Sequence, residues 1–138
     1  MEELIKLETA LLAKEKGFTD SVIDYWEKRK DNWEEEYPPS YDFGYGNYNK
    51  NDYQLSRPSQ SSLQSWLREK RIDITVITDW KNGNRVYYVG FSFVNDKNEI
   101  DILFSKDEDK NKIEYSDYEE ALEFGLFECL QRVSETVA

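Results

Sequence analysis

One stretch of the sequence decides the fold: IDITVITDWKNGNRVYYVGFSF, from Ile72 to Phe93. Apolar and polar residues alternate on both sides of the dipeptide Asn82-Gly83, the strongest short signal for a β-hairpin. A two-residue turn also determines which residues of the two strands lie opposite each other. We therefore predict an antiparallel hairpin with these facing pairs: Ile72 with Phe93, Ile74 with Phe91, Val76 with Val89, Thr78 with Tyr87, and Trp80 with Arg85.

A helix before this hairpin and a third strand after it are also predicted. The segment RPSQSSLQSWLREK, from Arg57 to Lys70, has the apolar spacing of a helix, and Ser59 is placed to cap it. Beyond the hairpin, Ile100, Ile102 and Phe104 alternate with other residues. This alternation predicts a third strand whose apolar side chains lie on the same face as those of the hairpin.

The last helix is predicted from the capping box that Ser116 and Glu119 form. A glycine inside a helix costs up to about 1 kcal/mol relative to alanine, so Gly125 indicates a close approach of this helix to the sheet. The residues expected on its inner face are Tyr118, Leu122, Gly125, Leu126, Cys129 and Val133. Residues 58–138 thus predict an α+β core of helix-strand-strand-strand-helix order, a three-stranded antiparallel meander with both helices on its apolar face.

The N-terminal part is expected to add two helices and a loop to the same domain, which spans residues 1–138. Apolar spacing predicts helices at residues 2–16 and 20–36, and two prolines follow the second helix. Residues 37–57 are rich in tyrosine, asparagine and glycine and show neither helical nor strand periodicity. They are predicted to form a loop.

Five residues are candidates for a binding surface. Tyr41, Tyr45 and Tyr48 lie in the loop, whose composition resembles that of antibody loops that use tyrosine for contact. The alternative is that these tyrosines pack onto their own domain. Trp66 and Arg68 belong to the helix before the hairpin and either dock it onto the sheet or form an exposed binding edge.

Composition excludes several kinds of chemistry. The chain has no histidine and one cysteine, so it lacks His-based catalysis, His metal ligands and an internal disulfide. Its net charge of −11 and the acidic start of the last helix disfavour direct binding to nucleic acids or anionic membranes. Pairs of carboxylates such as Glu119 with Glu123 are expected by chance among 29 acidic residues. We predict a cytoplasmic protein that is not an enzyme and has no metal and no cofactor.

Three sequence blocks resemble a family of small proteins from gut Bacteroides-type bacteria and their phages or mobile elements. The blocks are AKEKGF at Ala13–Phe18, RPSQSSLQSWLREKRIDI at Arg57–Ile74, and YEEALEFGLFECL at Tyr118–Leu130. They are similar to the family pattern of LAKEKGF, PTQSLLQKWLRE and YEEALEEGLKEAL helices around an aromatic sheet. The chain departs from it in having Ser59 in place of threonine and a longer Tyr/Asn-rich middle. The resemblance implies a phage- or mobile-element-derived accessory protein of uncharacterised activity, and implies no catalytic residue.

Three functional hypotheses follow from the sequence. The first is a non-enzymatic protein that binds another protein. The second is an acidic mimic that occupies a DNA- or RNA-binding protein through Glu34, Glu35, Glu36, Asp107, Glu108 and Asp109. The third is an enzyme that uses carboxylates alone, which requires a concave pocket where two or more acids converge.

The second face of the predicted sheet is also apolar enough to need a cover. Its expected residues are Ile77, Val86, Tyr88 and Leu103. Either the N-terminal helices or another subunit is expected to cover this face, so a homodimer is an open alternative.

Overall fold

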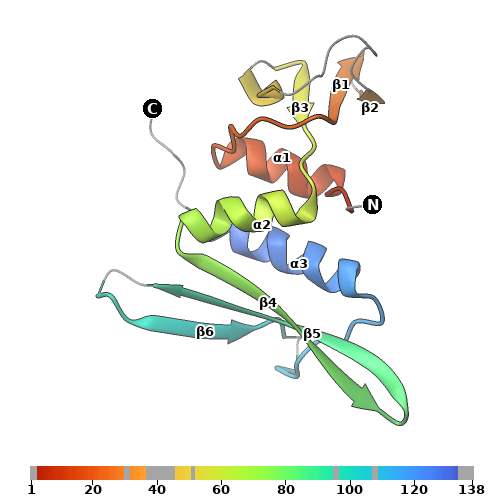
Figure 1. Ribbon diagram of the computed structural model, residues 1–138, viewed down its shortest axis with the longest axis vertical. Helices are drawn as coiled ribbons and strands as arrows, with labels where there is room; N and C mark the ends of the chain where they lie inside the picture. Colours follow the sequence, from red (N-terminus) through yellow and green to blue (C-terminus); the bar gives the residue numbers. More distant parts are fainter. Residues whose placement is uncertain are drawn as a thin grey trace.

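The computed structural model describes residues 3–29, 32–36, 46–50, 52–94, 97–106 and 109–133. Within these ranges the chain forms three α-helices and two three-stranded antiparallel sheets, which confirms the α+β class. Figure 1 shows the elements stacked in layers, with the large sheet at one end, α2 and α3 on its face, then α1, and the small sheet at the other end. One cluster of buried apolar side chains runs through both sheets and all three helices.

The large sheet contains the predicted hairpin. Its strands are β4 (Ile72–Lys81), β5 (Asn84–Val94) and β6 (Ile100–Phe104), in the order β4-β5-β6. All five facing pairs predicted between β4 and β5 are present, from Ile72 with Phe93 to Trp80 with Arg85. Both residues of the turn have positive φ, 52° for Asn82 and 79° for Gly83, as a tight hairpin turn requires.

The predicted facing of β6 is wrong. Leu103 lies opposite Phe91, whereas Ile102 lies opposite Ser92. Ile100, Ile102 and Phe104 therefore share the face away from the helices, and Leu103 lies on the helix side. No two-residue turn sets the register between β5 and β6, and a shift of one residue moves every side chain of a strand to the other face.

The helix α2 (Gln60–Glu69) begins where the sequence predicts. The Ser59 hydroxyl accepts a hydrogen bond from the Ser62 backbone N–H at 3.1 Å. Leu63, Trp66 and Leu67 are buried beneath it. This stripe confirms the amphipathic pattern and explains why α2 lies against β4 and α3.

The helix α3 (Tyr118–Leu130) is capped one residue later than predicted. The Asp117 carboxylate, rather than Ser116, accepts hydrogen bonds from the backbone N–H groups of Glu119 at 2.8 Å and Glu120 at 3.3 Å. Hydrogen bonding with the Glu119 side chain, above all, holds the pKa of the Asp117 carboxyl below its usual range. The two backbone N–H donors lower this pKa further. Aspartate is a cap as good as serine, so the local pattern fits either residue.

Gly125 confirms the predicted close approach of α3 to the sheet. A Cβ added at this position would lie 2.6 Å from Val89 Cγ2 and 3.1 Å from Ile74 Cγ2. Leu122, Leu126 and Cys129 are buried as predicted, whereas Tyr118 is exposed. The missing side chain at Gly125 therefore determines how near the helix lies to β4 and β5.

The N-terminal part contains one helix, not the two predicted. The first, α1 (Leu7–Glu15), is shorter than the predicted 2–16. The segment predicted as a second helix forms β1 (Tyr25–Arg29) and β2 (Asn32–Glu36), which pair with each other. The apolar positions of residues 20–36 are too few to hold a helix against the core, and Trp26 is buried instead as part of a central strand.

The predicted loop 37–57 contains a strand. Residues 37–45 lie outside the described ranges, but Tyr48–Lys50 form a short 3-10 helix, η1, and Gln54–Ser56 form β3. β3 pairs with β1, which gives the small sheet the order β2-β1-β3. Asn49 holds this region together, since its side chain donates to the Phe18 carbonyl at 2.8 Å and accepts from the Ser56 N–H at 2.9 Å.

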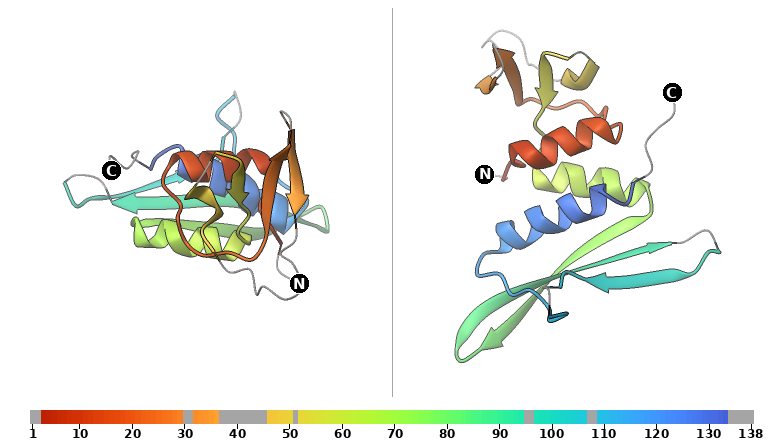
Figure 2. Two further views of the ribbon diagram at one scale, coloured as in Figure 1. Left: turned by 90° about the horizontal axis from the view of Figure 1, so that it is seen from above. Right: turned by 180° about the vertical axis from the view of Figure 1, so that it is seen from behind.

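The N-terminal elements lie on the helix side of the large sheet, as the two views in Figure 2 show. α1 packs against α3, and the small sheet packs beyond α1. Within the described part of the chain, no helix is long and apolar enough to cross a membrane.

We expect the substitution Gly125→Ala to destabilise the protein. Overpacking against Val89 and Ile74 costs about 1–3 kcal/mol, which outweighs the gain in helix propensity of up to about 1 kcal/mol. The free energy of unfolding, measured by urea denaturation, checks this. The control is the same change in a Val89→Ala background, where the loss should shrink because the 2.6 Å contact is removed. An equal loss in both backgrounds would contradict the close approach.

The cap of α3 gives a pH-dependent expectation. Asp117→Ala should lower the melting temperature more than Ser116→Ala, because Asp117 holds the two N–H donors. The pKa of Asp117 is depressed in the folded protein, so its contribution is present above the unfolded pKa of about 3.9. It is lost as the pH falls through the folded pKa. The gap between Asp117→Ala and the parent should therefore narrow below about pH 4, and a gap independent of pH would argue against this role.

Candidate functional site

A buried carboxylate joins the three helices. Glu123 on α3 is 7% exposed, and its Oε2 atom accepts from the Lys6 backbone N–H at 3.1 Å and from the Thr9 hydroxyl. Its Oε1 atom accepts from the Gln60 side-chain amide at 3.2 Å. A buried charge is tolerated when such donors surround it. Glu123 thus stabilises the start of α1, where Lys6 provides no side-chain cap.

The backbone around this carboxylate is held by further hydrogen bonds. The Gln60 amide also donates to the Glu119 carbonyl at 2.8 Å, which ties the first turn of α2 to α3. The segment that leads into α1 is fixed against the start of α2, since Ile5 N–H donates to the Pro58 carbonyl at 3.1 Å and Gln60 N–H donates to the Glu3 carbonyl at 2.8 Å. The position of Glu123 is therefore well defined.

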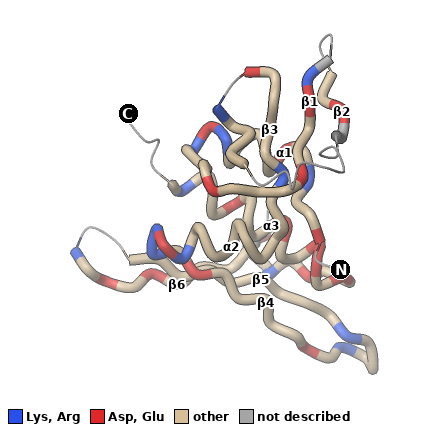
Figure 3. Tube along the Cα trace, turned by 45° about the horizontal axis from the view of Figure 1, so that its top comes forward, with Lys and Arg blue, Asp and Glu red and all other residues tan. Residues whose placement is uncertain are grey.

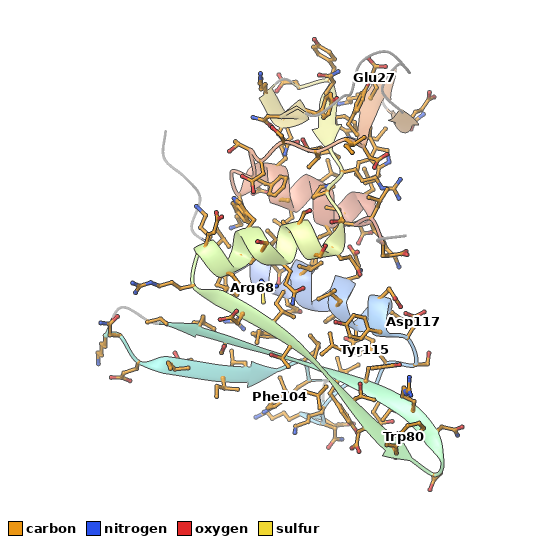
Figure 4. The ribbon with its side chains drawn as sticks, in the orientation of Figure 1. Glu27, Arg68, Trp80, Phe104, Tyr115 and Asp117 are labelled. Atoms are coloured by element: carbon orange, nitrogen blue, oxygen red, sulfur yellow. The ribbon has the colours of Figure 1, made fainter. Side chains whose placement is uncertain are left out.

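A cleft of about 630 Å³ opens beside Glu123, between the start of α1 and the flank of α3. Its apolar walls come from Leu7, Phe124, Phe127 and the ring of Tyr115. Tyr115 lies in the segment before α3, near the large sheet (Figure 4). The Tyr115 and Phe124 rings lie 5.7 Å apart at a tilt of 42°, so one end of the cleft is aromatic.

The charged residues of the cleft are mainly acidic. Glu8, Glu120 and Glu123 line it together with Lys6. Burial, above all, raises the pKa of the Tyr115 hydroxyl, and the nearby Glu120 and Glu128 carboxylates raise it further. The lining therefore carries three carboxylates against one ammonium group. A smaller cavity of about 190 Å³ shares Glu123 with the cleft and is also bordered by Asp117 and Glu119.

The sequence alone did not single out this cleft. The sequence predicts Glu119 and Glu123 to be a chance pair, whereas the structure places both at the smaller cavity and places Glu123 with Glu120 at the cleft. A signal for Glu123 exists, since it precedes the fully buried Leu126 and Leu130 by three and seven residues and so lies on their side of the helix. Nothing in the sequence shows that α1 would supply the opposite wall.

This cleft meets the geometric condition that the carboxylate-enzyme hypothesis set, because more than one acid lines a concave surface. The Glu123 oxygens, however, already hold three donors from α1 and α2. That carboxylate has a structural task. Enzymatic activity therefore stays a hypothesis, and it has no residue to which proton transfer is assigned.

Among the described residues, the structure does not join the predicted binding residues into one exposed surface. Tyr41 and Tyr45 lie outside the described residues. Tyr48 stacks on Tyr25 with a ring separation of 4.0 Å, so its ring packs on its own domain. Trp66 is 4% exposed and meets Phe18 edge to face, which leaves a partner almost no indole surface.

Of the three predicted binding residues that the structure describes, Arg68 is the exposed one. It lies near the end of α2 (Figure 4), and its Nε is 3.9 Å from Asp73 Oδ1. Both side chains are more than half exposed. An ion pair of this kind contributes little to stability, so Arg68 remains an exposed residue on the helix that buries Trp66.

The acidic-mimic residues are also separated. Glu34 lies on β2, whereas Asp109 follows β6, and these two segments lie at opposite ends of the molecule (Figure 1). The side chains of Glu35 and Glu36 and the residues Asp107 and Glu108 are outside the described part. Figure 3 shows basic residues interspersed with acidic ones along the chain.

A second candidate surface is the side of the large sheet that faces away from the helices, here called the open face. α1, α2 and α3 all lie on the other side (Figures 1 and 2), so the N-terminal elements do not cover it. Ile100 and Ile102 are 70% and 66% exposed. The apolar residues of the open face are Ile77, Val86, Tyr88, Val94, Ile100, Ile102 and Phe104.

Charged residues border the open face. Asp73 and Asp79 lie on its β4 side, opposite Ser92 and Val86. At the other border, the Lys112 ammonium lies 4.1 Å from the centre of the Phe104 ring. The surface is therefore an apolar strip with Asp73 and Asp79 along one edge. Near the hairpin turn, the Glu114 carboxylate contacts Lys81 at 2.6 Å and accepts from the Tyr88 hydroxyl at 3.3 Å.

Comparison of the chain with protein-family models, curated proteins and solved structures finds no match in any of the three.

The substitution Glu123→Gln should lower the free energy of unfolding by about 1–3 kcal/mol, the usual cost of a buried donor left without an acceptor. An amide offers one acceptor oxygen, whereas Glu123 uses both oxygens to accept from α1 and α2. Rotating the Gln60 amide gives no relief, because its nitrogen also donates to the Glu119 carbonyl.

Chemical denaturation of Glu123→Gln and Glu120→Gln checks this expectation. Glu120 lies on the same helix and is exposed, so its change should stay within about 0.5 kcal/mol of the parent. Equal stability of the two variants would show that the Glu123 charge is not what joins the helices.

Proposed function

We propose that this protein is a non-enzymatic accessory protein that binds another protein through the open face of the large sheet. The expected partner carries an apolar patch flanked by basic side chains. The origin from a phage or mobile element, implied by the sequence resemblance, is part of this proposal and stays a prediction.

The exposure of Ile100 and Ile102 carries the proposal. Single exposed apolar residues are ordinary on protein surfaces, but a continuous group of them marks an interaction site. Ile100, Ile102 and Phe104 follow one another on the same face of β6, and Ile77 and Tyr88 continue this face on β4 and β5. Covering such a strip removes several large side chains from water.

The open face is suited to a partner because it is rigid before binding. Its side chains stand on paired strands, and the Asn82-Gly83 turn holds the register of two of them. A preorganised surface loses little conformational freedom when a partner binds. A strand is also available for pairing, since β6 is the last strand in the described order of the sheet.

The charge of the protein supports a basic partner. Asp73 and Asp79 lie on the open face, and the whole chain has a net charge of −11. Opposite charges at the rim of an interface raise the association rate and align the partner, while the apolar centre supplies most of the affinity. Binding should therefore persist at high salt, with slower association.

A homodimer is the competing occupant of the open face. Two copies of β6 could pair antiparallel about Ile102, which would place Ile100 opposite Phe104 and Asp101 opposite Leu103 of the other copy. This register puts no carboxylate opposite another. The net charge of −11 on each copy opposes it, so we favour a basic partner over a second copy.

The proposal is tested with Ile102→Lys on the open face and Ile23→Lys as its control. Ile23 is 41% exposed and precedes β1, at the far end of the molecule. Both positions are exposed, so each change should shift stability by less than about 1 kcal/mol. Proteins captured from host lysate by the parent are purified, and their dissociation constants are measured for all three forms.

Ile102→Lys should weaken binding at least about tenfold, equivalent to about 1.4 kcal/mol, and Ile23→Lys should leave it unchanged. Equal binding by Ile102→Lys and the parent would overturn the proposal. Sedimentation of the parent protein alone tests whether a second copy occupies the open face. If the parent is a dimer and Ile102→Lys is a monomer, the open face is assigned to self-association instead. Capture of a nucleic-acid-binding protein that both variants retain would favour the acidic mimic.

A further inference from the structure

We propose that the cleft between α1 and α3 binds a small organic cation, an ammonium group carried on an apolar body. The inference is independent of the proposed protein binding, because the cleft lies on the helix side of the large sheet and the open face lies on the other side.

The size and walls of the cleft fit such a ligand. Its volume of about 630 Å³ lies within the range of about 300–1,000 Å³ that is usual for small-molecule sites. Leu7, Phe124 and Phe127 offer apolar contact, and the aromatic surface is mainly that of Phe124, which is 38% exposed and whose ring lies 5.7 Å from the buried ring of Tyr115. Aromatic rings also attract a cation placed over their faces.

The charges of the cleft select a cation over a neutral or anionic ligand. Glu8, Glu120 and Glu123 line it. The one basic residue of the lining, Lys6, also borders the smaller cavity, and its charge acts on Asp117 there by lowering the pKa of that carboxyl. The raised pKa of Tyr115 reflects burial first and then the carboxylates around it.

Glu123 is placed to anchor the ammonium group. Three donors from α1 and α2 hold its carboxylate in one position. A carboxylate has about four acceptor sites on its two oxygens, so Glu123 retains capacity for a further donor. Because the group is already ordered, a ligand that donates to it does not have to immobilise a flexible side chain. Glu120, four residues before Phe124 and exposed, supplies a second carboxylate at the rim.

The first experiment compares two probes of matched shape, 4-phenylbutylammonium and 4-phenylbutan-1-ol, titrated into the full chain and followed by amide NMR shifts. The ammonium should bind at least about tenfold more tightly than the alcohol, since a hydrogen bond to a charged partner contributes about 1.5–3 kcal/mol. Shifts should concentrate at residues 6–9 and 120–127. Equal affinity of the two probes, shifts elsewhere, or no binding of the ammonium would each overturn the proposal.

A variant tests the contribution of the carboxylates. Glu120→Gln keeps the shape of an exposed side chain and removes one charge, so the ammonium affinity should fall by about two- to fivefold. Glu69→Gln, at the exposed end of α2, removes the same charge far from the cleft and should leave the affinity unchanged. The alcohol should bind all three forms equally. Equal losses from both variants would mean that only the net charge of the protein matters, and would overturn the assignment to this cleft.

Discussion

The buried carboxylate of Glu123 is the interaction on which the arrangement of the helices depends. It accepts hydrogen bonds from the first turn of α1 and from the first residue of α2, while its own backbone belongs to α3. Without these donors a charge at this depth would be strongly unfavourable, and without the carboxylate the donors would be left unpaired. The N-terminal segment therefore has one position in which the Glu123 carboxylate is hydrogen-bonded and the donors of α1 are paired.

The two candidate surfaces, the open face of the large sheet and the cleft between α1 and α3, arise for different reasons. All three described helices lie on one side of the large sheet, where α2 and α3 pack on it and α1 lies beyond them. Gly125 allows α3 to lie directly on Val89 and Ile74. The opposite face keeps Ile100 and Ile102 in solvent. The cleft lies where the start of α1 meets α3, and the flank of α3 with Phe124 and Phe127 forms one of its walls.

The central part of the fold was predictable because its signals are local. The Asn82-Gly83 turn and the alternation around it determine every facing pair of the hairpin, and the Ser59 cap with Leu63 and Trp66 defines α2. The helix predicted for residues 20–36 is wrong because the signal that decides their structure is not local. They carry two tryptophans at a spacing that suits a helix, yet Trp26 is buried because β1 pairs with β3, a strand that lies far along the sequence. No local pattern contains that partner.

The sequence by itself determined the α+β class, the hairpin register, the places of α2 and α3, and the close approach at Gly125. Each depends on a short stretch whose turn, cap or periodicity has one good solution. The tertiary structure alone decided the face that β6 presents, the pairing of β1 with β3 and the meeting of α1 with Glu123. These features depend on which distant segments lie side by side. The alternation of side chains in one strand does not show which set of them lies toward the core until the neighbouring strand and its register are known. Both candidate surfaces are of this second kind, since they consist of residues that come together only when the layers are stacked.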